Sequence, residues 1–277
     1  MVKHILASGC SFTAGGTNKL IKDHINCWPT RLSELLDCKV TNLAVSGAGN
    51  TQIVDSIIKE VCKHPKKYDL VVVGFTEAMR LCFPNANLEG NYTSMQPFRE
   101  VEDLLRYKQS SILSKRLTDW YYHSRAFFSL GVIGQIFMGN YHNPAYQVEE
   151  KKIRTWENLD MWFDRWLINI LTLQNFLETQ GVNYIFGQGP DIMGSSELFQ
   201  VTWDETNDRL RNHVYKSKIV ENICYENWVN FPPAFTHLYE MIVSDNIVNQ
   251  HDFHPNVEGH KFIASKYYEK YKEVYGS

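Results

Sequence analysis

The sequence predicts an α/β fold built on a parallel sheet that helices cover on both faces. Strand-like and helix-like segments alternate between Lys3 and Val73, and the strand-like segments are short and almost continuously apolar. Strands buried on both faces have this pattern, because crossover helices pack on each side of a parallel sheet. The alternation breaks down at about residues 85–157, which predicts a helical insertion in a single domain spanning residues 1–277.

The first half of this sheet is predicted from five segments in chain order. They are a strand at 3–8, a helix at 28–36, a strand at 39–43, a helix at 51–62 and a strand at 70–73. Pro29 suits the first turn of its helix, where the missing N–H costs nothing. Ile53, Ile57 and Val61 recur at helical spacing in the second helix.

The second half of the chain is less regular. Within the insertion, residues 102–117 and 119–128 have helical patterns, and residues 140–146 are expected to form a loop. A long helix is expected at 159–177 and a strand at 182–186, with Gly181 ending the helix. Residues 195–250 are expected to hold one or two helices and a short fifth strand. A final helix follows, with Pro255 at its first position and Phe262, Ile263 and Tyr267 at helical spacing.

Composition excludes several classes of protein. The 277 residues are 44% hydrophobic and 21% charged, which excludes dominant disorder, and the 16 Gly and 9 Pro exclude collagen-like repeats. The formal net charge of −3 argues against a broad nucleic-acid-binding face, so no nucleic-acid partner is expected.

The sequence also bears on the compartment. The longest mainly apolar run, residues 126–138, is well short of the ~20 residues that a membrane span needs. The residues before the first strand do not resemble a signal peptide, so none is expected. The six cysteines form no CxxC pair, which is typical of free thiols in a reducing compartment. We expect a cytoplasmic or virion-associated protein with no membrane contact.

A serine stands directly after the first strand, in Gly9-Cys10-Ser11-Phe12-Thr13. Ligands of parallel α/β sheets bind outside the carboxyl ends of the strands, so Ser11 is placed where a nucleophile would act. Its backbone N–H would also face an anion at the start of a helix. Taken alone, the segment is better explained as a tight turn with a helix cap.

Two further segments follow the next two strands. In the first, Asn42-Leu-Ala-Val-Ser-Gly47-Ala-Gly-Asn50, the N–H of Gly47 would donate to an oxyanion; the alternative is an ordinary loop whose helix is capped by Asn50 or Thr51. In the second, Gly74-Phe-Thr76-Glu, the Thr76 hydroxyl would reach the same site; the alternative is turn chemistry.

The segment His251-Asp252-Phe253-His254-Pro255 precedes the last helix. A histidine takes a serine proton near neutral pH, and a neighbouring carboxylate holds it in the required tautomer. Polar capping of a helix is the plainer alternative. A metal site at His251, Asp252, His254 and His260 matches no zinc spacing, so no metal and no other cofactor is expected.

Together these segments resemble the SGNH hydrolases, also called the GDSL esterase family. Gly9-Cys10-Ser11-Phe12-Thr13 resembles the family's first block, and Gly47 matches the oxyanion glycine of its second. Gly74-Phe-Thr76-Glu falls on the third block, and His251-Asp252-Phe253-His254-Pro255 on the fifth. The first and last blocks look most similar to SGNH-like proteins of tailed phages and marine bacteria. The resemblance implies a three-layer α/β/α sandwich with a sheet of flavodoxin-like order.

Three positions depart from the family pattern. Cys10 replaces the acidic residue beside the nucleophile, and Thr76 replaces the oxyanion asparagine, a type of donor whose loss costs ~10²–10³ in rate. The family's Asp lies three residues before the His, where this chain has His251. The carboxylate of Asp252 lies two residues before His254, so Asp252 orients His254, or the site works as a Ser–His dyad, or it is inactive.

The resemblance implies a serine esterase acting on a small ester, such as an O-acetylated carbohydrate. Ser11 would be the nucleophile, His254 its base and Asp252 the orienting carboxylate. The N–H groups of Ser11 and Gly47, with Thr76 or Asn50, would hold the oxyanion. A non-catalytic binding or virion protein of the same fold, an acyltransferase at the same site, and Cys10 as nucleophile are the alternatives. The oligomeric state stays open.

Overall fold

The computed structural model describes residues 2–15, 27–76, 78, 81–84, 92–95, 159–189, 213, 216–229 and 254–276. For residues 81–84, 92–95 and 159–162 it describes the backbone only. No helix within these ranges combines the length and apolarity that crossing a membrane requires. The five cysteines whose side chains are described are free thiols.

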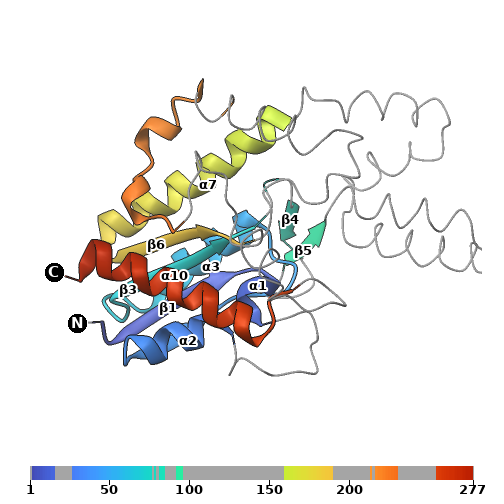
Figure 1. Cartoon of the computed structure of the whole chain (residues 1–277). Coiled ribbons are helices and arrows are strands. Elements are labelled where there is room, and N and C mark those ends of the chain that lie inside the picture. Colours follow the sequence, from blue (N-terminus) through green and yellow to red (C-terminus); the bar gives the residue numbers. More distant parts are fainter. Residues whose placement is uncertain are drawn as a thin grey trace, which may run out of the picture.

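A parallel sheet of four strands forms the centre of the fold (Figure 1). The strands are β1 (His4–Gly9), β2 (Lys39–Asn42), β3 (Leu70–Phe75) and β6 (Asn183–Gln188), in the order β2-β1-β3-β6. Beside β6, Phe186 forms an isolated parallel bridge with Trp228. The Val229 N–H also donates to the Phe186 carbonyl at 2.8 Å, so this segment extends the sheet past β6. The predicted α/β class and flavodoxin-like order are confirmed.

Helices cover both faces of this sheet, as predicted, and give three layers (Figure 1). On one face lie α3 (Asn50–Lys63) and α7 (Leu159–Gln180); on the other lie α2 (Trp28–Leu35) and α10 (Val257–Tyr275). Side chains alternate between the faces along each strand. Leu6, Val71 and Val73 belong to the α3/α7 side, whereas Ile5, Ala7, Leu70 and Val72 belong to the α2/α10 side.

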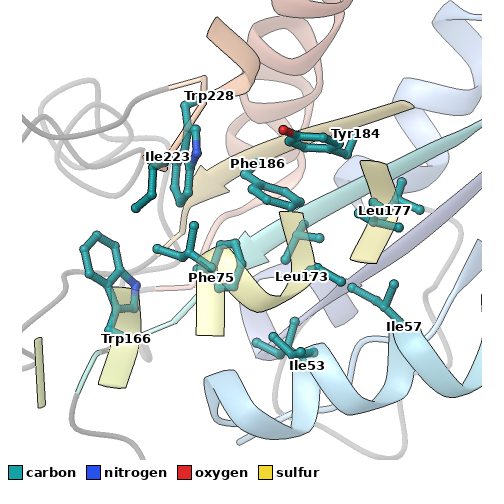
Figure 2. Packing of buried hydrophobic residues seen from close by; sticks show 14 of the residues in the cluster. Ile53, Ile57, Phe75, Trp166, Leu173, Leu177, Tyr184, Phe186, Ile223 and Trp228 are labelled. Carbon is teal, nitrogen blue, oxygen red and sulfur yellow. The ribbon is translucent and has the colours of Figure 1, made fainter. Parts of the chain in front are cut away.

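Aromatic residues fill the α3/α7 side at the carboxyl end of the sheet. Figure 2 shows Trp228 and Trp166 beside Phe75 and Phe186, which come from neighbouring strands. Phe75 stacks on Trp228 with ring centroids 5.6 Å apart, and it meets Phe186 edge to face at 5.3 Å. Burial of large rings dominates core energetics, so this cluster anchors the 220s segment on the sheet.

The predicted long helix is confirmed as α7. Its stripe of Phe163, Trp166, Ile170, Leu173 and Leu177 is fully buried. The helix ends at Gln180, and Gly181 follows with φ of 65°, a left-handed conformation that glycine adopts without strain. The last helix starts later than predicted. Pro255 precedes the cap, and the Asn256 side chain accepts from the Gly259 N–H at 3.0 Å, so α10 begins at Val257.

A helical insertion was expected after β3, but the first described elements of this region are two strands. The strands β4 (Leu81–Pro84) and β5 (Tyr92–Met95) pair as an antiparallel ribbon, which sequence periodicity did not indicate. The two helical patterns at 102–117 and 119–128, and most of 195–250, lie outside the described residues. Within the 195–250 region, the described part contains the short 3₁₀ helices η3 (Val220–Asn222) and η4 (Tyr225–Asn227). The single-domain organisation stays a prediction.

The α2/α10 layer depends on one buried tyrosine. Tyr267 is fully buried, its ring stacks on Trp28 at 4.3 Å, and its hydroxyl donates to the Val73 carbonyl at 2.7 Å. We expect Tyr267→Phe to lower the free energy of unfolding by about 1 kcal/mol, because one buried hydrogen bond is lost while the stacking remains. Urea unfolding would measure this loss. Tyr268→Phe is the matched control, and equal losses in the two variants would contradict the assignment.

Candidate active site

The candidate site lies where β1 and β3 end. Gly9 and Gly74 are paired in register, so Ser11 and Thr76 each lie two residues beyond the paired positions. Short helix α1 (Ser11–Ala14) begins at Ser11 and turns across the strand ends. The N–H groups of a first helical turn have no partner within the helix, which leaves the Ser11 N–H pointing away from it.

Two glycines make room for this turn. Thr13 is buried against both, and a Cβ on Gly74 would lie 2.8 Å from Thr13 Oγ1. A Cβ on Gly9 would lie 2.9 Å from the carbonyl oxygen of Gly74, closer than real side chains approach. The glycines therefore let α1 sit directly on the strand ends, and this contact sets the height of Ser11 above the sheet.

The structure brings Ser11 and His254 together. His254 Nε2 lies 2.8 Å from Ser11 Oγ, although the two residues are 243 positions apart in the chain. Ser11 is only 6% exposed. The Phe12 ring lies against the His254 imidazole at a centroid distance of 5.0 Å. A hydroxyl that donates to Nε2 leaves the imidazole proton on Nδ1, the nitrogen for which Asp252 was predicted as the acceptor. Asp252 and His251 lie outside the described residues.

His254 is held in place through the start of α10. Figure 1 shows α10 running back along the sheet from the α1 end towards the edge that carries both chain termini. Its first turn is fixed by the Asn256 cap and by His260, whose Nδ1 accepts from the Trp28 N–H at 3.3 Å. Burial, with a smaller contribution from His254, lowers the pKa of His260 to about 4. His260 is therefore neutral at physiological pH, with its proton on Nε2, and adds no positive charge beside His254.

Gly47 lies in a turn that is fastened to the end of β1. The Val45 N–H donates to the Gly9 carbonyl at 3.1 Å, and the Ala48 N–H donates to the Val45 carbonyl at 3.0 Å. Gly47 is the third residue of that turn and has φ of 83°, which favours glycine. The loop therefore runs beside the strand that leads to Ser11.

Thr76 and Asn50 are buried together at 0% and 3% exposure. The Thr76 N–H donates to Asn50 Oδ1 at 2.9 Å, and Asn50 Nδ2 donates to the Thr76 carbonyl at 3.0 Å. Within the described part of the chain, Thr76 Oγ1 is buried with no hydrogen-bond partner. Asn50 is not a helix cap, contrary to the alternative considered from sequence: Gly49 is the cap and Asn50 is the first residue of α3.

Sequence reasoning missed two contributions to this site. Asn42 binds the Thr13 carbonyl in α1 and the Ala44 N–H at the start of the Gly47 loop, and His260 ties α10 to α2. An asparagine at the end of a strand was the only available signal for Asn42. Of the four residues weighed as a metal site, His251 and Asp252 lie outside the described residues, and His260 Nδ1 accepts from the Trp28 N–H.

No family model and no curated protein matches this sequence. The chain is similar to several solved structures. One is the psychrotrophic esterase EstA from Pseudoalteromonas sp., with a TM-score of 0.46 and 11% identity, covering 99% of this chain and 100% of that one. Another is a member of the lipolytic protein G-D-S-L family from Veillonella parvula, with a TM-score of 0.44 and 13% identity, covering 99% and 98%. A third is Axe2, an acetylxylan esterase from Geobacillus stearothermophilus, with a TM-score of 0.44 and 12% identity, covering 97% and 93%.

TM-scores and identities this low carry no inference about activity.

The buried imidazole of His260 makes stability depend on pH. Because its pKa falls from 6.5 to about 4 on folding, the unfolded chain takes up the proton first as the pH drops. The free energy of unfolding is therefore highest above pH 6.5, and protonation of the unfolded chain lowers it by about 3 kcal/mol as the pH falls from 6.5 to 4. We expect His260→Gln, which keeps an acceptor for the Trp28 N–H, to show a shallower loss of stability between these two pH values. Urea midpoints across that range measure it, and parallel slopes in both proteins would contradict the assignment.

Proposed function

We propose that this protein is a serine esterase in which Ser11 is the nucleophile and His254 the general base. The observation that carries the proposal is the 2.8 Å contact between Ser11 Oγ and His254 Nε2. A nucleophile and its base within hydrogen-bond reach, at the carboxyl edge of a parallel sheet, is the arrangement that acyl transfer through serine requires. Cys10 lacks such a contact among the described residues, so it is not assigned as the nucleophile.

The reaction follows from this pair. Ser11 Oγ bonds to the ester carbonyl carbon while its proton moves to His254 Nε2, and the carbonyl oxygen becomes an oxyanion. The bond to the leaving oxygen then breaks, and the alcohol departs with the proton from His254. Water repeats the sequence on the acyl group, releasing the acid and restoring Ser11. We assign to Asp252 the acceptor position for the His254 Nδ1 proton.

Three donors are proposed for the oxyanion: the N–H groups of Ser11 and Gly47, and the Thr76 hydroxyl. The Ser11 N–H belongs to a first helical turn, and Gly47 has the turn conformation that exposes a peptide edge without a side chain. Thr76 Oγ1 is a buried hydroxyl that lacks a partner among the described residues, and leaving such a group unpaired costs roughly 1–3 kcal/mol. A hydrogen bond to an oxyanion would recover that cost during the reaction.

A small acyl group suits this site best. Ser11 is only 6% exposed, which favours a short acyl group over a bulky one. An O-acetylated carbohydrate is the first natural ester to test. The proposed chemistry uses the protein's own side chains and backbone. If the enzyme is a transferase, the hydroxyl of another molecule takes the place of water in the second step and receives the acyl group.

Replacing Ser11 tests the proposal directly. We expect Ser11→Ala to lower kcat on p-nitrophenyl acetate by about 10³-fold or more, because the covalent path is lost. A fluorophosphonate probe should add once to the wild type, by intact mass, and not at all to Ser11→Ala. Ser265→Ala, whose hydroxyl bonds the Phe262 carbonyl within α10, is the matched control and should retain both turnover and labelling.

The outcomes separate the possible functions. Absence of turnover and of any adduct in the wild type would contradict the esterase and favour a binding protein. An adduct with acyl transfer to an added alcohol, at the expense of hydrolysis, would identify a transferase.

The Thr76 hydroxyl makes a separate prediction. We expect Thr76→Val to lower kcat by about 10- to 100-fold, because one oxyanion donor is lost. The free energy of unfolding should stay the same or rise by up to about 1 kcal/mol, because a buried hydroxyl without a partner is replaced by a methyl group. Ester kinetics and urea unfolding of the same variant measure both effects. Unchanged kcat would remove Thr76 from the oxyanion site while leaving Ser11 and His254 in place.

A further inference from the structure

The loop at residues 43–49, between β2 and α3, carries Gly47 and is bounded by two asparagines. We propose that Asn42 and Asn50 are positioning residues that brace this loop against the two segments holding the other oxyanion donors. Asn42 ties it to the Ser11 helix, and Asn50 ties it to Thr76. This inference rests on the proposed esterase function and assigns Asn50 a different task from the direct oxyanion contact expected from sequence.

Asn50 holds the Thr76 side of the brace. Its carboxamide accepts from the Thr76 N–H at 2.9 Å and donates to the Thr76 carbonyl at 3.0 Å. Both backbone polar groups of one residue are thus fixed by one planar side chain, which leaves that peptide little freedom to rotate. Asn50 is also the first residue of α3, three positions after Gly47. A shift of the loop therefore shifts Thr76 as well.

Asn42 holds the nucleophile side. Asn42 Nδ2 donates to the Thr13 carbonyl at 3.1 Å, in the helix that begins with Ser11. Asn42 Oδ1 accepts from the Ala44 N–H at 3.0 Å, which turns the chain out of β2 into the loop. A weaker contact from Nδ2 reaches Cys27 Sγ at 3.6 Å, beside the start of α2. One side chain therefore joins the nucleophile helix, the Gly47 loop and the next helix.

The braces matter because oxyanion stabilisation depends on donors that are already in position before the reaction. The three proposed donors come from three different segments. The Gly47 loop is connected to the Ser11 helix through Asn42 and to Thr76 through Asn50. A displacement of about 1 Å at such a site can cost ~10² in rate without any loss of a catalytic group. The two carboxamides are the side chains that link these segments to one another among the described residues near the loop.

Gln174 supplies a matched control for the brace. Its buried carboxamide also clamps backbone at two points, donating to the Asn222 carbonyl at 3.0 Å and accepting from the Cys224 N–H at 2.8 Å. The segment that it holds carries none of the proposed catalytic groups. Gln174→Ala should therefore lower stability as Asn50→Ala does, and leave kcat on p-nitrophenyl acetate unchanged.

We expect Asn50→Ala to lower kcat by about 10- to 100-fold with KM little changed, because the substrate still binds while the oxyanion donors are misplaced. Asn42→Ala should have the same kinetic signature, and it provides a second test if Asn50→Ala does not fold. Retained kcat in a folded Asn50→Ala or Asn42→Ala variant would overturn the inference.

The variant Asn50→Asp separates positioning from a purely structural role. A protonated carboxyl group can donate to the Thr76 carbonyl and accept from its N–H, as the carboxamide does, whereas a carboxylate can only accept. The ratio of kcat in Asn50→Asp to kcat in the wild type should therefore rise as the pH falls from 8 towards about 5.5, since burial raises carboxyl pKa values into this range. Dividing by the wild-type kcat at each pH removes the pH dependence that both proteins share. A ratio independent of pH would contradict the brace.

The failure of this inference is distinguishable from failure of the esterase. If the wild type has no turnover and Ser11→Ala changes nothing, the proposed function is wrong. If Ser11→Ala abolishes turnover while the asparagine variants keep full kcat, only the brace is wrong.

Discussion

The contact of Thr13 with two bare glycines is the constraint on which the site depends. Gly9 and Gly74 are paired on adjacent strands, and a Cβ on Gly9 would overlap the Thr13 side chain and lie 2.9 Å from the Gly74 carbonyl oxygen. Because nothing separates the turn from the strand ends, Ser11 lies directly at the edge of the sheet, low enough for His254 to reach it. A single methyl group on Gly9 would force the turn to shift and the nucleophile with it, whereas one on Gly74 would press only on the end of the Thr13 side chain.

The other half of the pair reaches the site through the C-terminal helix. Tyr267 stacks on Trp28 and bonds β3, while Tyr275 exchanges hydrogen bonds with the Tyr184 backbone on β6. These contacts fix α10 along its length, and the Asn256 cap fixes its start. His254 lies two residues before that cap, so its position follows from packing far from the site. The apolar core therefore determines the geometry of the polar contact.

Buried polar groups gather near the sheet edge at a cost in stability. His260 is held neutral by burial, Thr76 keeps a hydroxyl without a partner among the described residues, and Asn50 uses both polar atoms on the backbone. Apolar side chains at such positions would pack without these costs. In this site the buried hydrogen bonds fix the relative positions of the three donor segments, because a hydrogen bond constrains direction as well as distance.

The sequence by itself determined the alternation of strands and helices and the buried stripe of α7. These features are local: period, β-branched content and turn residues act over a few positions, so β1, β3 and α3 were predicted to within a few residues. The antiparallel ribbon of β4 and β5 was missed because its short strands have no strong period.

Only the tertiary structure decided the 2.8 Å approach of His254 to Ser11, the bonds of Asn42 and Asn50, and the neutral state of His260. Each of these depends on the meeting of side chains that are distant in sequence, and on burial that no local pattern specifies.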